Sequence, residues 1–178
     1  MSNFSFWLLM ALCCHSGLSH ADIKDIIASA ERGDVESQFD LGLMYANGLG
    51  GVPKDAVKAI KWLTKAAEQG DHLAQYHLGE MYAEGEGIPQ DKTKAIEWLT
   101  KAAEHGLNLA QHRLGEMYLG GDGTSVNLIK AHAYTSIARA NGINFANVDA
   151  ISSKMTPEQI AEAKKLATEI FERIKAKK

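Results

Sequence analysis

The sequence predicts an all-α protein, built as an α/α solenoid of about three antiparallel helix-pair repeats with a capping helix at the C-terminal end. First, a motif of the form Leu-Gly-x-Met-Tyr occurs three times, and the glycines that end successive repeats lie 36 or 37 residues apart. Second, apolar residues within each copy follow helical spacing. Third, only 3 of the 178 residues are proline. One helix pair cannot bury its apolar face alone, so neighbouring pairs must stack.

The first element is a predicted signal peptide that spans residues 1–21. The run Phe4–Cys14 is apolar and uncharged, and residues 19–21 have small side chains at their first and third positions, as a cleavage site requires. The run is also short for a membrane span. We therefore expect an exported protein, periplasmic or secreted, with no stable membrane insertion after cleavage. An uncleaved anchor or a cytosolic tail is the alternative, because Met1–Asn3 contains no Lys or Arg.

Composition narrows the possible partners and cofactors. The formal net charge is −3, and nucleic-acid binding would need a basic face, so no nucleic-acid partner is expected. Cys13 and Cys14 are the only cysteines, and both lie in the signal segment. A mature chain from Asp22 would therefore contain no disulfide and no thiolate metal site, and its stability would come from packing alone.

The repeats follow the signal segment. A helix over 22–33 precedes them as an orphan second helix, and three repeats then span 34–70, 71–106 and 107–142. In the first repeat the spacing predicts a helix A over Val35–Asn47 and a helix B over Asp55–Gln69. Glycines in the intervening loop end helix A, and Gly70 ends helix B.

Three positions within the repeats predict how the helices pack. Gly42, Gly79 and Gly115 share one register inside helix A, where glycine costs about 1 kcal/mol relative to alanine, so close approach of two helices is expected there. Residues of two further registers are expected to fill the core and the helix interfaces. These residues are Met44, Met81, Met117, Trp62 and Trp98.

Residues 143–178 are predicted to form helices that cap the array. Thr156 is a candidate N-cap, followed by Pro157 at the first helical position and Gln159 as the partner in a capping box. Five apolar side chains then fall on one face at helical spacing. They are Ile160, Ala163, Ala167, Ile170 and Ile174.

The repeated motif resembles the Sel1-like repeat, a relative of the tetratricopeptide repeat. The linked pattern Ala-x-x-x-Leu-Gly-x-x-Tyr-x-x-Gly-x-Gly, then Lys-Ala-x-x-Trp-x-x-Lys-Ala-Ala-x-x-Gly, covers about Gly33–Gly142 with two close copies. The third copy departs from it, because residues 124–127 replace the usual loop and Tyr134 replaces Trp. The resemblance implies a right-handed superhelix in which the A helices line a concave surface that binds a protein or peptide segment.

By similarity to that arrangement, positions around the repeat leucine face the partner. These positions vary between copies, as a surface for a specific, non-repeating partner would, although unconstrained solvent positions would also vary. Phe39, Tyr76 and His112 fall in line as candidate exposed anchors. The partner-binding residues are predicted to be Phe39, Asp40, Leu43, Tyr76, His77, Glu80, His112, Arg113, Glu116 and Leu119.

The sequence lacks the catalytic motifs of serine β-lactamases and of zinc enzymes. Sel1-like proteins have been linked to β-lactamase activity, which would require Ser-x-x-Lys and Lys-Thr-Gly elements, and neither occurs. The histidines show no zinc-ligand spacing. We therefore expect a non-catalytic scaffold or adaptor with no cofactor and no metal. A hydrolase of this family is the alternative, and a structural role through self-association is a third hypothesis.

Overall fold

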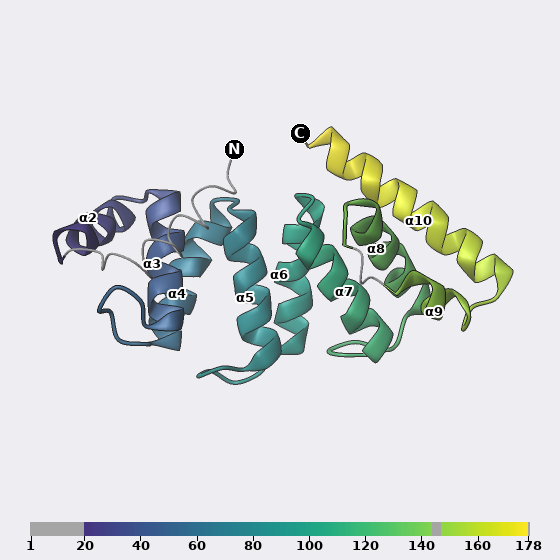
Figure 1. Cartoon of the computed structure of the whole chain (residues 1–178), viewed down its shortest axis with the longest axis horizontal. Coiled ribbons are helices and arrows are strands. Elements are labelled where there is room, and N and C mark those ends of the chain that lie inside the picture. The colour runs from purple at the N-terminus through teal and green to yellow at the C-terminus, as the bar shows by residue number, and fades with distance from the viewer. Residues whose placement is uncertain (1–19, 144–146, 178) are drawn as a thin grey trace. The chain divides into compact units, whose positions relative to one another are not determined.

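A computed structural model describes residues 20–143 and 147–177, and all regular structure in these residues is helical. Most of the predicted signal segment, residues 1–19, lies outside the described residues. The chain divides into two compact units, residues 1–71 and 72–178. The prediction of an all-α protein of consecutive helix pairs is confirmed (Figure 1).

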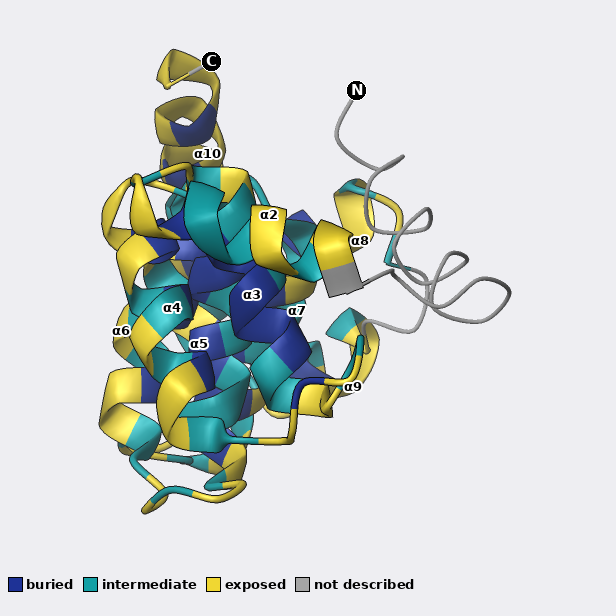
Figure 2. Cartoon of the chain, turned by 90° about the vertical axis from the view of Figure 1, so that its left-hand side faces the viewer, coloured by how far each residue is buried: buried dark blue, intermediate teal, exposed yellow. Residues whose placement is uncertain are grey.

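The first unit contains three described helices, α2 (His20–Glu31), α3 (Val35–Asn47) and α4 (Ala56–Glu68). Helix α3 packs against both α2 and α4, and half of the buried residues described in this unit lie on it (Figure 2). The predicted bounds of helix A agree with α3. Helix B is one residue shorter at each end than predicted, because Asp55 is its N-cap and Gln69 its C-cap.

The second unit contains the six remaining helices of the described residues. Two antiparallel pairs, α5 with α6 and α7 with α8, follow one another along the chain, and α9 and α10 both pack against α8. The bounds are α5 (His72–Glu84), α6 (Lys92–Glu104), α7 (Asn108–Gly120), α8 (Leu128–Ala140), α9 (Val148–Ser152) and α10 (Pro157–Ala176).

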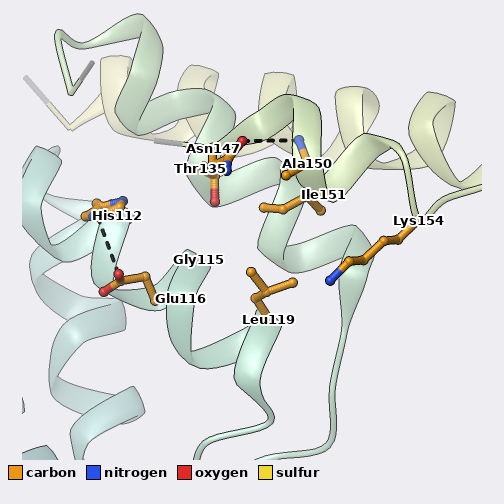
Figure 3. Close-up of a pocket in the computed structure, with 9 residues that line it drawn as sticks. All are labelled: His112, Gly115, Glu116, Leu119, Thr135, Asn147, Ala150, Ile151 and Lys154. Atoms are coloured by element: carbon orange, nitrogen blue, oxygen red, sulfur yellow. Dashed lines mark hydrogen bonds and ion pairs between the residues drawn. The ribbon is translucent and has the colours of Figure 1, made fainter. Parts of the chain in front are cut away.

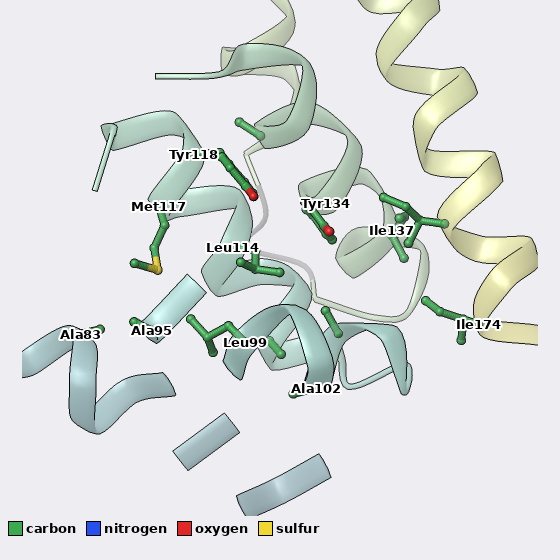
Figure 4. Close-up of a cluster of buried hydrophobic side chains, with 14 of the residues drawn as sticks. Ala83, Ala95, Leu99, Ala102, Leu114, Met117, Tyr118, Tyr134, Ile137 and Ile174 are labelled. Carbon is green, nitrogen blue, oxygen red and sulfur yellow. The ribbon is translucent and has the colours of Figure 1, made fainter. Parts of the chain in front are cut away.

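The core of the second unit runs from α5 to α10. Leu99 of α6 and Leu114 of α7 lie at its centre, and Ile174 of α10 contributes from the C-terminal end (Figure 4). Tyr134, which replaces the repeat Trp, stacks on Tyr118 with ring centroids 5.9 Å apart. The third repeat therefore has an aromatic contact between its two helices at the position of the substitution.

The shared register of the mid-helix glycines has a steric cause. A Cβ atom added to Gly42 would lie 2.7 Å from Cγ of Leu63, and one added to Gly79 would lie 2.5 Å from Cγ of Leu99. At Gly115 the added atom would collide with the hydroxyl of Thr135. The predicted close approach of helices A and B is thus confirmed in each of the three repeats.

Each loop between helices A and B is closed by the same backbone hydrogen bond, which we call the loop clamp. The amide of the helix-B N-cap residue donates to the carbonyl of the repeat tyrosine, and a lysine of helix B lies over that tyrosine ring at 4.9–5.3 Å. The N···O distances of the clamps are 2.8 Å for Asp55–Tyr45, 2.9 Å for Asp91–Tyr82 and 2.8 Å for Asn127–Tyr118. The divergent third loop is therefore closed like the other two.

The start of the final helix agrees with the prediction. The side chain of Thr156 accepts from the Gln159 amide, Gln159 accepts from the Thr156 amide, and Pro157 occupies the first helical position. Of the predicted apolar face, Ala163, Ile170 and Ile174 are buried, whereas Ile160 and Ala167 are half-buried. Among the predicted core methionines, Met44 and Met117 are buried and Met81 is half-buried.

Candidate functional site

Three of the predicted partner-binding residues, Phe39, Asp40 and Leu43, lie on α3 of the first unit. Phe39 and Leu43 have exposed fractions of 7% and 8%, so the prediction that Phe39 is an exposed anchor is wrong about its exposure. Because α3 packs against helices on two sides, little of its circumference remains for solvent. A role of these residues in partner binding stays a prediction.

Asp40 is a half-buried carboxyl in an acidic neighbourhood. Burial raises the pKa of Asp40 to about 6, and repulsion from Glu36, Asp34 and Asp71 adds to the shift. Asp40 is therefore partly protonated slightly below neutral pH, unlike an ordinary surface aspartate.

In the second unit, α5 and α7 bring three predicted residues together as a charged strip, defined as Glu80, Arg113 and Glu116. Arg113 Nε donates to Glu80 Oε1 at 3.0 Å, and its Nη1 donates to Glu116 Oε2 at 3.4 Å. The exposed side-chain fractions are 23% for Glu80, 31% for Arg113 and 53% for Glu116. One guanidinium thus bridges two helices and meets two carboxylates.

The electrostatics of the strip are set by burial as well as by charge pairing. Burial raises the pKa of Glu80 more than the neighbouring Arg113 lowers it. Burial also raises the pKa of Tyr76 to about 12, and the negative charge of Glu80 contributes to this shift. The Tyr76 hydroxyl therefore stays protonated at neutral pH.

The predicted aromatic and histidine residues flank this strip. The rings of Tyr76 and His77 meet edge to face with centroids 5.5 Å apart, and Tyr76 also packs against the core. His112 Nε2 lies 3.7 Å from Glu116 Oε1. Tyr76 and His112 are half-buried rather than fully exposed.

A cavity of about 160 Å³ opens beside the strip, between α7 and α9 (Figure 3). His112, Glu116 and Leu119 reach it from α7, so three predicted residues line it together. The remaining lining residues are Gly115 of α7, Thr135 of α8, and Asn147, Ala150, Ile151 and Lys154 of α9 and its flanks.

The residues that α8 and α9 contribute to this cavity were not predicted. They lie outside the repeat pattern or, like Thr135, at a register that packs against the mid-helix glycine. One signal in the sequence was available, because Asn147 caps α9 by accepting a hydrogen bond from the Ala150 amide at 3.2 Å. A helix of five residues is nevertheless too short to be recognised by its apolar period.

A second polar group links α8 to α9. The buried His132 has Nε2 3.1 Å from Ser152 Oγ and Nδ1 3.3 Å from Ser136 Oγ. Ser152 Oγ donates its proton to the carbonyl of Val148, so the neutral ring must donate from Nε2. The serine hydroxyl is thereby held as a structural link between the two helices, and its proton is not shared with the imidazole as in a nucleophile–base pair.

The described residues contain neither a metal-ligand cluster nor a bilayer-spanning helix. Within 20–143 and 147–177, no group of three or more His, Cys, Asp or Glu side chains could hold a metal ion. No helix in the described part of the chain combines the length and the apolar character that a bilayer span requires. What the strip and the cavity offer is a surface with fixed charges and one recess, which suits binding.

The fold and this surface define a helix-pair repeat protein of the tetratricopeptide-like class. The profile described as Sel1 repeat matches residues 35–71, 72–107 and 108–143, which is more than half of the chain. The chain therefore belongs to the Sel1 repeat family, and the resemblance seen in the sequence is confirmed. Sel1 repeats are generally protein-interaction scaffolds, and the proteins that carry them typically bind other proteins.

Solved structures agree with this assignment. The crystal structure of a Sel1 repeat protein from Oxalobacter formigenes is similar with a TM-score of 0.62 and 38% identity, over 70% of this chain and 93% of that one. The structure of c5321, described as a protective antigen of uropathogenic Escherichia coli strains with an SLR fold, is similar with a TM-score of 0.56 and 29% identity. That match covers 86% of this chain and 41% of the antigen. No curated protein sequence matches the chain.

Proposed function

We propose that this protein is an exported, non-catalytic scaffold that binds a segment of another protein on the surface formed by α5 and α7. The observation that carries the proposal is the charged strip of Glu80, Arg113 and Glu116, which lies directly beside the cavity between α7 and α9. The strip and the cavity share Glu116, so one partner segment can contact both at once.

The strip is suited to recognition because its geometry exists before a partner arrives. Arg113 is held by Glu80 from the neighbouring helix, so little side-chain entropy is lost when the guanidinium meets a partner. Arginine and tyrosine are also among the residue types that most often carry binding energy at protein interfaces. Tyr76 and Arg113 supply one of each on adjacent helices.

Export is a second part of the proposal and rests on the sequence of residues 1–21. The partner would then be a protein of the periplasm or of the extracellular space. A chain without cysteines after cleavage can persist in such oxidising compartments without risk of unwanted disulfides.

The experiment compares capture of partner proteins by immobilised wild-type protein and by a double variant, Glu80→Gln with Arg113→Gln. Changing both members avoids leaving one partly buried charge unpaired. The control is Glu162→Gln with Lys165→Gln, which removes one charge of each sign from exposed positions of α10. Captured proteins are quantified by mass spectrometry, and thermal melts of all three proteins are compared.

We expect at least one protein to be captured about tenfold less by the strip variant than by the wild type and the control, with similar melting temperatures. A set of captured proteins that is unchanged by the strip variant would contradict the assignment of this surface.

A further inference from the structure

The cavity between α7 and α9 has the size of a single side chain. Its volume is about 160 Å³, close to the roughly 150 Å³ of an apolar cavity that accommodates a benzene molecule. It opens onto the same surface as the strip, since Glu116 belongs to both and His112, which lies beside Glu116, also lines the cavity. A segment that lies along α5 and α7 can therefore insert one residue into it (Figure 3).

The walls of the cavity select an apolar side chain. Leu119 and Ile151 face each other across it, and Ala150 adds a third apolar wall (Figure 3). Ile151 is buried and belongs to the core of the second unit, so this wall is held in place before binding. Burying an aromatic or large aliphatic group against such walls contributes roughly 1.5–3 kcal/mol.

The two sides of the cavity carry charges of opposite sign. On the α5 side, Glu80, Glu84 and Glu116 bring three carboxylates and Arg113 brings one guanidinium, so the excess charge there is negative. Each of these carboxylates raises the pKa of Tyr76, whereas Arg113 lowers it. On the α9 side, the ammonium of Lys154 reaches back toward α7 (Figure 3).

We propose that the cavity is an anchor pocket for one phenylalanine-sized or leucine-sized side chain of a partner segment whose neighbouring residues on the α5 side are lysine or arginine. The positive charge of the segment meets the excess carboxylates of α5 and α7, and Lys154 repels it from the α9 side. The pocket thereby fixes both the register and the direction of the bound segment. This inference rests on the proposed scaffold function and names the chemistry of its partner.

Four short peptides test the proposal directly. They share a frame of alanine and glutamine and differ in the anchor, Phe or Ala, and in the two residues before it, both Lys or both Glu. Each peptide is titrated into isotope-labelled protein, and binding is followed by NMR at the backbone amides of Leu119 and Ile151. We expect the Phe/Lys peptide to bind about tenfold more tightly than the Ala/Lys and Phe/Glu peptides.

Two matched variants locate the binding. Ala150→Leu fills the pocket from an exposed position of α9, and Ala161→Leu adds the same atoms to an exposed position of α10. The first substitution should abolish the advantage of Phe over Ala, and the second should leave that advantage intact. Equal binding of Phe and Ala peptides, or no saturable shift at millimolar peptide, would overturn the proposal.

The two proposals fail differently. If Ala150→Leu captures partner proteins as well as the wild type while the strip variant does not, the scaffold function stands and the anchor pocket is wrong. If neither variant changes the captured proteins, both the binding surface on α5 and α7 and the anchor pocket are wrong.

Discussion

His132 places an ionisable ring in the buried contact between α8 and α9. Burial lowers the pKa of His132 below its ordinary value, Lys164 of α10 adds to the effect, and Asp149 of α9 opposes it. In the unfolded chain His132 has its ordinary pKa of about 6.5. As the pH falls, His132 therefore gains a proton in the unfolded state before it does so in the folded state. The free energy of unfolding therefore decreases as the pH drops through about 6.5 toward the folded-state pKa.

We expect wild-type protein to lose more thermal stability between about pH 7.5 and 5.5 than the variant His132→Gln, by about 2–4 °C in Tm. The measurement is a pair of melts at each pH, with His105→Gln at an exposed position as the control. Parallel pH profiles of Tm for wild type and His132→Gln would contradict a lowered pKa of His132 in the folded state.

Asp40 also contributes to the pH dependence of stability, so the wild type must be compared with the His132→Gln variant. Its pKa of about 6 exceeds the unfolded value of 3.8, so the folded state gains protons first and becomes relatively more stable as the pH falls through 6. Asp40 and His132 thus act in opposite directions over overlapping pH ranges. The wild-type profile alone reports their sum, whereas the difference between wild type and His132→Gln isolates one group.

At the scale of the helix pair, the close approach at Gly79 can be tested by one substitution. An added Cβ would lie 2.5 Å from Cγ of Leu99, so Gly79→Ala must displace α5 from α6 or force Leu99 off its rotamer. We expect a net loss of about 1–2 kcal/mol of unfolding free energy, measured by urea denaturation, even though alanine favours helix more than glycine.

Gly120 provides the matched control for this change. It also lies in a helix, but an added Cβ would have its nearest neighbour, a carboxylate oxygen of Asp122, at 3.4 Å. Gly120→Ala should therefore be neutral or slightly stabilising. A Gly79→Ala protein as stable as Gly120→Ala would show that the helices can separate without cost.

The elements that could be predicted from the sequence are those specified by local chemistry. Helix α3 has the bounds that its apolar spacing and flanking glycine indicate, and the capping box of α10 follows from Thr156 and Gln159 alone. Both features depend on residues within one or two turns of each other, so they can be read along the chain.

Features that depend on several helices were harder to predict from the sequence. The exposure of Phe39 was predicted wrongly because it depends on α2 and α4 together. The cavity was missed because α9 is five residues long and because Thr135, from a third helix, α8, completes its lining. In contrast, Glu80, Arg113 and Glu116 were predicted as one surface, since the repeat period places their registers side by side.

For the whole molecule, the fold of the described residues rests on packing, since residues 20–143 and 147–177 contain no cysteine. Export is a prediction at this scale. We expect expression in a Gram-negative bacterium to yield a periplasmic or secreted protein whose intact mass lacks residues 1–21.

Two arginine substitutions separate a signal peptide from an uncleaved anchor or tail. Leu9→Arg interrupts the apolar run and should leave full-length protein in the cytoplasm. Asn3→Arg adds the positive charge that the n-region lacks and should preserve or increase export. Full-length mass in every fraction, for the wild type as well as for both variants, would contradict a cleaved signal peptide.

The loop clamp has a consequence for how such a chain can change in length. Tyr45 and Asp55 are ten residues apart, whereas the corresponding tyrosine and N-cap residues of the other two loops are nine apart, yet all three clamps close at 2.8–2.9 Å. The clamp therefore closes at the same distance whether one residue more or fewer lies between its two members, and the entropy of closing a longer loop grows only slowly. In the third loop Asp122 also pairs with Lys92 of α6, so the first two loops are the better insertion points, where new sequence can be grafted between clamped residues.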